Sequence, residues 1–332
     1  MRLTITLLLL LLAPAALASV ESDYQAAREA YQKGKYERFQ KYADKIPARH
    51  PLAPYVRYWR LKLDNPDQAS VRLFIEENPD TPLSERLRND LARQFGRAED
   101  WPAFRAQYQA IARPDQELQC FDLRRRLAGG EPVEAEGVAL WRTPRDLPSS
   151  CDPLFVTLAE RGALRVDDRL ARLRLALDAG NLRLAREINA RLGDELALDA
   201  DALARAQRAP ARFLEENQNS AGWREAALYA LGLAAKADPE AAAGLWEARQ
   251  ADFPEADRAY GWGQIGMHAA RRHDPRALAW FARSGEANSD AQRLWRTRAA
   301  LRAGKWIEVY NSIQAMPAAL QNEAVWRYWK AR

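Results

Sequence analysis

The sequence predicts an all-α fold, a solenoid of stacked helical hairpins that is tetratricopeptide-like but irregular. Two observations lead to this prediction. Residues 170–192 have the pattern of two helices joined by a turn, and related hairpins recur about every 34 residues, the period typical of helix-turn-helix repeats. Neither helix of such a hairpin can bury its apolar stripe alone, so similar hairpins must stack on it.

The hairpin at 170–192 shows the pattern most completely. Apolar residues fall on one face of each expected helix, namely Leu170, Leu173 and Leu177 in the first and Leu184, Ile188 and Leu192 in the second. Between them, Gly180 has no Cβ and can adopt the left-handed conformation that ends a helix, while Asn181 can cap the next helix with its side-chain oxygen. We therefore expect a turn at these two residues.

Two other hairpins repeat this turn, one near each end of the chain. Each has a Gly-Lys pair, at Gly34 and at Gly304, followed by apolar residues at i, i+3, i+7 and i+10 and by a helix-ending proline at i+11. The matching sets are Tyr36, Phe39, Ala43, Ile46 and Pro47, and Trp306, Val309, Ile313, Met316 and Pro317. In the hairpin at 170–192, Asn189 takes the i+7 position, so Ile188 must supply the apolar face instead.

Proline marks three further helix starts. Asn65-Pro66, Asp238-Pro239 and Asp274-Pro275 each place a capping side chain before a proline at the first helical position. The first hairpin is expected at 24–46, and two later helices, at 55–59 and 325–329, are crowded with aromatic residues. Such residues fill the wedges between solenoid helices, although a platform for carbohydrate is the alternative.

Residues 1–18 are expected to be a signal peptide. Arg2 is followed by the apolar run 7–12 and by Ala16-Leu17-Ala18, the small-x-small pattern that signal peptidase recognises, with cleavage after Ala18. A membrane anchor is the alternative, but the apolar run is shorter than the ~20 residues of a membrane-spanning helix, and Pro14 follows it. We expect one solenoid domain at 19–332, exported to the periplasm and without a membrane span.

Composition and motifs exclude several classes of function. The net charge of +5 is small and arginines alternate with acids, so no nucleic-acid partner is expected. The three histidines, His50, His268 and His273, are too few and unsuitably spaced for a metal site. No phosphate-binding glycine loop, dinucleotide fingerprint or serine-hydrolase elbow occurs, so no cofactor is expected.

Cys120 and Cys151 are the only cysteines in the sequence. In a cytosolic protein they would be interpreted as buried small side chains, but an exported chain with a single pair favours a disulfide. The bridge would close a segment rich in glycine and proline, where only 123–127 and 138–141 are expected to be ordered. It would stabilise the fold by about 3–4 kcal/mol, and the spacing excludes a CxxC redox motif.

Four stretches together resemble one protein family. In chain order they are 51–55 (PLAPY), 151–155 (CDPLF) with the earlier Cys120, 172–181 (RLRLALDAGN) and 326–329 (WRYW). Their order and spacing are similar to those of the soluble lytic murein transglycosylases over most of residues 22–332. The resemblance implies a right-handed, U-shaped superhelical domain, a bridge between the paired cysteines, and a separate lysozyme-like catalytic domain.

None of the catalytic motifs of that family occurs in its context in this sequence. Glu21-Ser22 lies beside the expected cleavage site, where its carboxylate would be solvated, and 259–263 (AYGWG) is only superficially similar to the family's Ala-Tyr-Asn-Ala-Gly stretch. The family's reaction needs a glutamate of raised pKa that acts first as acid and then as base in an enclosed groove. We therefore assign no catalytic residue, no cofactor-binding residue and no metal ligand.

Two functions compete. The resemblance implies the superhelical domain of a periplasmic lytic transglycosylase, an enzyme that cleaves the bond between N-acetylmuramic acid and N-acetylglucosamine in peptidoglycan with a 1,6-anhydro product. The helix expected at 324–332 has no C-cap glycine, which favours a chain that stops before its catalytic domain. The alternative is a non-catalytic periplasmic adaptor whose solenoid binds a protein or peptide. The expected partners are peptidoglycan or cell-wall proteins.

Overall fold

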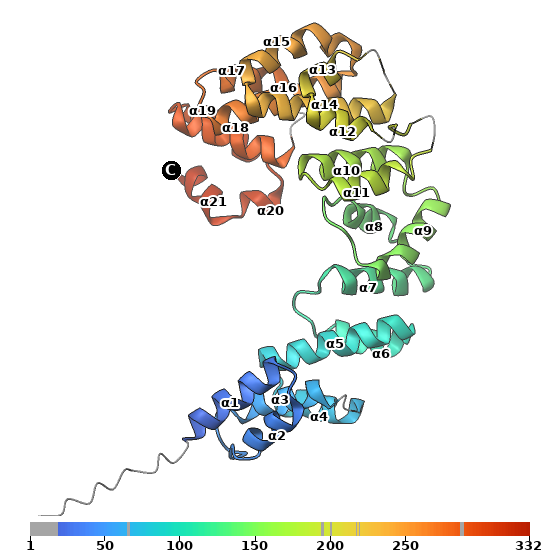
Figure 1. Cartoon of the computed structure of the whole chain (residues 1–332), viewed down its shortest axis with the longest axis vertical. Coiled ribbons are helices and arrows are strands. Elements are labelled where there is room, and N and C mark those ends of the chain that lie inside the picture. Colours follow the sequence, from blue (N-terminus) through green and yellow to red (C-terminus); the bar gives the residue numbers. More distant parts are fainter. Residues whose placement is uncertain are drawn as a thin grey trace, which may run out of the picture. The chain divides into compact units, whose positions relative to one another are not determined.

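The computed structural model describes residues 19–64, 67–193, 196–199, 201–216, 218, 220–285 and 289–332, and all regular structure in these residues is helical (Figure 1). The all-α prediction is confirmed. The expected signal peptide at 1–18 and the predicted turn at Asn65-Pro66 lie outside the described residues. No helix in the described ranges is long and apolar enough to cross a membrane.

The helices fall into two compact units that divide after Gly130. The first unit contains α1 (Val20–Gln32), α2 (Tyr36–Ala43), α3 (Ala53–Leu63), α4 (Gln68–Glu77), α5 (Pro82–Ala98), α6 (Trp101–Tyr108) and α7 (Gln116–Ala128). The expectation that 19–332 forms one solenoid domain stays a prediction, as do the right-handed sense and the U shape.

The second unit begins at Glu131 and contains the remaining helices. These are α8 (Glu134–Trp141), η1 (Ser149–Cys151), α9 (Asp152–Glu160), α10 (Val166–Asp178), α11 (Leu182–Asn189), α12 (Ala202–Arg208), α13 (Pro210–Leu214), α14 (Ala221–Ala237), α15 (Pro239–Arg249), η2 (Gln250–Asp252), α16 (Glu255–Arg271), α17 (Ala277–Ser284), α18 (Asp290–Arg302), α19 (Trp306–Gln314), α20 (Ala318–Gln321) and α21 (Ala324–Ala331).

The hairpin predicted at 170–192 is present as α10 and α11. Gly180 has φ +72°, and the Asn181 side chain accepts a hydrogen bond from the Leu184 amide at 3.2 Å, so both turn predictions are confirmed. Ile188 is buried and supplies the apolar face as expected. Asn189 instead holds the following loop, because its amide group donates to and accepts from the backbone of Leu198 at 3.0 and 2.7 Å.

The matching turns at Gly34 and Gly304 also adopt positive φ, +61° and +65°. The later apolar positions of both hairpins are buried as predicted, namely Phe39, Ala43, Ile46, Val309, Ile313 and Met316. The first position departs from the prediction in both copies, because Tyr36 and Trp306 are exposed. The residue directly after the Gly-Lys pair therefore lies outside the buried stripe.

The remaining helix starts follow the predicted caps with one correction. Asp238 accepts hydrogen bonds from two amides of the first turn of α15, with Pro239 at the first position, as predicted. After Asp274 the helix starts later than predicted, at Ala277. The Asp274 carboxylate is engaged by Arg276, whose backbone amide donates at 2.9 Å and whose guanidinium adds further bonds, so Pro275 lies in the turn.

Aromatic rings fill the core of the first unit. Trp59 is buried and contacts the rings of Tyr24 and Tyr31, with centroid distances of 5.2 and 5.5 Å. A Cβ at Gly96 would lie 2.5 Å from the Phe121 ring, so a glycine at this position lets α5 and α7 approach closely. The expectation that aromatic helices serve the core is confirmed here for Trp59.

The two cysteines are buried and disulfide-bonded, as predicted. The sequence between Cys120 and Cys151 is more ordered than predicted, because α7 continues to Ala128 and α8 already begins at Glu134. Gly137 accounts for the difference. A Cβ on Gly137 would lie 2.4 Å from Cδ1 of Leu158, so this glycine permits close packing of α8 on α9 instead of marking a loop.

Helix α16 is the centre of the second unit, and every residue from Tyr260 to Ala270 is buried. It packs against α14, α15, α17 and α18. Two of its glycines make this packing possible: a Cβ at Gly261 would lie 2.4 Å from the Trp246 ring, and one at Gly266 would lie 2.9 Å from the Phe281 ring. Large aromatic side chains from α15 and α17 thus rest directly on the α16 backbone.

Candidate functional site

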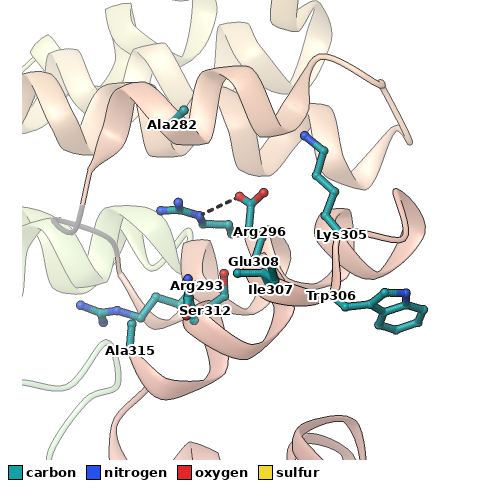
Figure 2. Close-up of a pocket in the computed structure, with 10 residues that line it drawn as sticks. Ala282, Arg293, Arg296, Lys305, Trp306, Ile307, Glu308, Ser312 and Ala315 are labelled. Atoms are coloured by element: carbon teal, nitrogen blue, oxygen red, sulfur yellow. Dashed lines mark hydrogen bonds and ion pairs between the residues drawn. The ribbon is translucent and has the colours of Figure 1, made fainter. Parts of the chain in front are cut away.

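The second unit has several cavities, and a large one lies among α17, α18 and α19. We call it the α19 pocket. It has a volume of about 670 Å³ and is lined by Ala282, Arg293, Arg296, Lys305, Trp306, Ile307, Glu308, Asn311, Ser312 and Ala315 (Figure 2). This volume lies within the range of small-molecule sites in proteins.

Local sequence signals position the helices of the α19 pocket. Ser289 and Gln292 form a reciprocal capping box at the start of α18, because each side chain bonds the backbone amide of the other residue, at 3.3 and 3.0 Å. Gly304 closes α18 with its positive φ, and the Lys305 amide donates to the Ala300 carbonyl at 3.0 Å. The side chains of 305 and 306 are thereby placed at the edge of the cavity.

The charge of the α19 pocket is mainly positive. Arg296 donates to the Glu308 carboxylate at 3.4 Å, a long contact, and Arg293 pairs with Asp290 at 3.1 Å. The exposed Lys305 extends toward α17 in Figure 2, and no described carboxylate lies within ion-pairing distance of its ammonium group. An anion entering the cavity would therefore meet a cation that has no competing partner.

An aromatic surface adjoins these cations. Trp306 is 57% exposed, and its ring stacks on Trp329 with centroids 6.4 Å apart and planes 26° apart. Tyr328, which contacts Trp329 edge-on, is 54% exposed. Flat apolar rings beside charged groups suit a ligand with an apolar or sugar face and an anionic substituent.

A second cavity, which we call the Asp178 pocket, lies between the end of α10 and helices α14 and α16. Its volume is about 300 Å³, and its polar lining consists of Asp178, Tyr229, Lys236, Gln264, His268 and Arg271. Helix α16 contributes polar side chains at 260, 264 and 268, spaced by four so that they share one face. Gln264 and His268 line the cavity itself, and Tyr260, one turn earlier on the same face, reaches Asp178.

Asp178 is held by two neutral donors from α16. The Tyr260 hydroxyl donates to Oδ2 of Asp178, and Nε2 of Gln264 donates to Oδ1 at 2.9 Å. Gln264 Nε2 also lies 2.8 Å from the Tyr260 hydroxyl. These bonds fix the orientation of the carboxylate, although part of Asp178 remains accessible to solvent.

The surroundings shift the pKa values of Asp178, Tyr260 and His268. The loss of water around Asp178 raises the pKa of its carboxyl, an effect that the bonds from Tyr260 and Gln264 and the charge of Arg174 only partly oppose. Burial and the nearby Asp178 raise the pKa of Tyr260 well above its ordinary value. Burial, together with the charges of Arg271 and Lys236, lowers the pKa of His268 to about 4, so the imidazole is neutral at pH 7.

A buried ion cluster of Arg174, Glu225 and Asp257 packs against the Tyr260 ring. Arg174 donates two bonds of 2.7 Å to the Glu225 carboxylate and one of 2.6 Å to Asp257, and its guanidinium lies 4.7 Å from the centre of the Tyr260 ring. Burial alone would lower the pKa of Arg174, but the two carboxylates raise it above the ordinary value. The cation is thus permanently charged and anchors the Tyr260 ring.

None of these pocket residues was expected to take part in a binding site. Tyr260 was noted only in a stretch superficially similar to a catalytic motif, and His268 only as a histidine unsuited to a metal site. The structure brings Tyr260 to Asp178 but separates His268 from His273, which lies beyond the end of α16 with φ +63°. The described residues contain no group of three or more His, Cys, Asp or Glu side chains placed to bind a metal.

The successive helical hairpins place the chain among the helical solenoid proteins. Comparison with known proteins narrows this class. The chain is 25% identical over 296 residues to the soluble lytic murein transglycosylase of Escherichia coli, a match that covers 85% of this chain and 45% of the relative. The enzyme of the same name from Salmonella typhimurium is 24% identical over 305 residues with the same coverage. No protein-family model matches the chain.

Solved structures show the same resemblance. An inactive mutant of the lytic transglycosylase Slt from Pseudomonas aeruginosa superposes with a TM-score of 0.63 at 27% identity, covering 93% of this chain and 52% of that one. The 70 kDa soluble lytic transglycosylase of Escherichia coli has the same fold, with a TM-score of 0.52 at 22% identity. The predicted resemblance to soluble lytic murein transglycosylases is confirmed, and the chain spans about half the length of these relatives.

Proposed function

We propose that this chain is the superhelical domain of a periplasmic lytic murein transglycosylase and binds peptidoglycan while a separate catalytic domain cleaves it. In this proposal the complete enzyme breaks the bond between N-acetylmuramic acid and N-acetylglucosamine and leaves a 1,6-anhydro product. The observation that carries the proposal is the match to soluble lytic murein transglycosylases along 85% of the chain. The sequence has no Ala-Tyr-Asn-Ala-Gly stretch, and its Glu21-Ser22 pair is exposed, which supports the assignment of cleavage to another domain.

The α19 pocket supports the binding role. The peptide stems of peptidoglycan carry free carboxylates, and its glycan strands present sugar faces. Lys305, without a described acidic partner, suits a carboxylate, and the exposed rings of Trp306 and Tyr328 suit a sugar face. The same surface would serve a catalytic domain by keeping the strand close to it.

A sedimentation assay with insoluble murein tests this function. The chain from Ser19 onward should co-sediment with murein but release no anhydro-muropeptides. The double variant Lys305→Ala/Trp306→Ala should bind about tenfold more weakly, which corresponds to a loss of about 1.4 kcal/mol. Because both side chains are exposed, the variant should fold normally.

The first hairpin offers a matched control. Lys35 and Tyr36 occupy the same positions after Gly34 as Lys305 and Trp306 do after Gly304, so Lys35→Ala/Tyr36→Ala should leave murein binding unchanged. Equal losses in both double variants would show that binding does not use the α19 pocket. Release of anhydro-muropeptides by the chain alone would overturn the assignment of cleavage to another domain.

The competing function is a non-catalytic periplasmic adaptor that binds a protein or peptide, and the Asp178 pocket favours it because a second polar site is available. Reading the DNA beyond codon 332 separates the two. A continuing frame with the Glu-Ser and Ala-Tyr-Asn-Ala-Gly motifs supports the enzyme, and a stop codon without them supports the adaptor. Export is part of both proposals, and a mature protein that begins at Ser19 in the periplasmic fraction would support it.

A further inference from the structure

The Asp178 pocket has polar atoms that the protein itself leaves unused. The side chains of Gln264 and His268 are only 4% and 9% exposed. Nε2 of Gln264 is engaged by Asp178 and Tyr260. Within the described ranges, no group hydrogen-bonds to Oε1 of Gln264 or to either ring nitrogen of His268. Both side chains line the Asp178 pocket, so these atoms are available to a ligand that enters it.

A glycine keeps the approach to these atoms open. Gly232 on α14 faces them, and a Cβ there would lie 3.6 Å from Oε1 of Gln264 and 3.9 Å from Nε2 of His268. Any larger side chain at 232 would cover both atoms. The helix needs no glycine for its backbone at this position, because Gly232 is not among the residues with positive φ. The open space above Gln264 and His268 thus depends on the missing side chain.

The charges of the pocket are separated along α16. The acidic group, Asp178, lies at the turn of Tyr260 and Gln264, to which it is bonded. The basic groups Lys236 and Arg271 lie near His268, whose pKa both lower by their charge. From Gln264 to Arg271 the helix rises ~10 Å at 1.5 Å per residue. One end of the cavity is therefore negative and the other positive.

We propose that the Asp178 pocket binds a short peptide of two or three residues through its free ammonium and carboxylate groups, the ammonium on Asp178 and the carboxylate on Lys236 and Arg271. An extended chain covers ~3.5 Å per residue, so two or three residues span the distance between the opposite charges. The middle of the peptide lies over Gly232, where Oε1 of Gln264 accepts a hydrogen bond from a peptide N–H. This site is separate from the α19 pocket, and the proposal does not depend on murein binding.

Calorimetric titration with dialanine and trialanine tests the proposal. Blocking the amine as an N-acetyl group or the carboxylate as an amide removes one of the two charges, and each should weaken binding by at least about tenfold. Asp178→Asn should weaken the free peptide by a similar factor while leaving the N-acetyl peptide unaffected, because the latter has no ammonium group to lose. This second comparison distinguishes a binding role of Asp178 from a general loss of structure.

Gly232→Ala provides a variant that should remain folded. The new methyl would make ordinary contacts at 3.6 Å or more, and alanine favours a helix over glycine, yet it covers the polar atoms and should weaken peptide binding about tenfold. Gly244→Ala in α15 is the control, since nothing lies within 4 Å of its added Cβ, and it should bind like the unchanged chain. The proposal is overturned if blocked and free peptides bind equally, if Gly232→Ala has no effect, or if the unchanged chain binds neither peptide.

Discussion

The hydroxyl of Tyr260 donates a hydrogen bond to the carboxylate of Asp178, which joins the middle of α16 to the last residue of α10, 82 residues earlier in the sequence. The bond connects the central helix of the second unit to the hairpin whose turn was the clearest signal in the sequence. It also fixes the acidic end of the Asp178 pocket. The link is therefore both structural and positioned at a candidate binding site.

Removing this hydroxyl should destabilise the second unit. Tyr260→Phe leaves the carboxylate of Asp178 with one donor fewer, and a hydrogen bond to a charged group contributes about 1.5–3 kcal/mol. We expect urea unfolding to show a loss in that range. Tyr31→Phe is the control, because the Tyr31 ring stacks on Trp59 and no described group hydrogen-bonds to its hydroxyl; its effect should be within about 0.5 kcal/mol. Similar losses in both variants would contradict the role given to the Tyr260 bond.

The hairpin turns were predictable because their chemistry is local. Gly180 adopts positive φ, and the adjacent Asn181 caps the next helix. These two neighbouring residues are enough to predict the turn without knowledge of the rest of the fold. The same holds for Asp238 before Pro239. The helix start after Asp274 was misplaced because the side chain of Arg276 competes for the capping carboxylate.

The Asp178 pocket was not predictable in this way. Its parts come from α10, α14 and α16, and no local rule brings Asp178, Gly232 and Gln264 together. One signal was present, the polar residues at 260, 264 and 268 in the otherwise uncharged and mostly apolar stretch 259–270. The α19 pocket was hidden for a different reason: Trp306 fits the apolar pattern of its hairpin, yet it lies one position outside the buried face.

The buried ion cluster behind the pocket should be sensitive to loss of its cation. Arg174→Met would leave the buried carboxylate of Glu225 without its counterion, which costs about 3–5 kcal/mol, and would leave Asp257 with only its longer ion pair to Arg224 at 3.7 Å. The measurement is the midpoint of urea unfolding at pH 7. Arg57→Met is the matched control, since the Arg57–Glu77 pair of 2.6 Å is about half exposed at both partners and should contribute no more than about 1 kcal/mol. A loss as small as that of the control would show that the cluster is not an essential support.

Close packing on α16 predicts a strong effect of one added methyl group. Gly261→Ala would place Cβ 2.4 Å from the ring of Trp246, which is fully buried and has no free direction to move. We expect a loss of about 1–3 kcal/mol from overpacking, visible as a lower melting temperature. Gly244→Ala should instead stabilise α15 by about 0.5 kcal/mol, because its Cβ meets only open space. Stabilisation by Gly261→Ala would refute the packing argument.

The neutral His268 should make the stability of the chain fall as the pH is lowered. Its pKa is about 4 in the folded chain against an ordinary value of 6.5, so between these values the unfolded chain binds the proton more readily. The free energy of unfolding therefore keeps its full value above pH 6.5 and falls progressively as the pH is lowered toward 4. The loss is about 2 kcal/mol at pH 4.5. Asp178 acts in the opposite direction, because its raised pKa means that the folded state holds a proton more tightly than the unfolded one.

Urea unfolding of the unchanged chain and of His268→Gln at pH 7.5 and 4.5 isolates the contribution of the histidine. The loss of unfolding free energy between the two pH values should be about 2 kcal/mol smaller in the variant. An equal loss in both proteins would mean that the imidazole is protonated without cost in the folded chain, and that His268 is more hydrated than its burial beside α14 indicates.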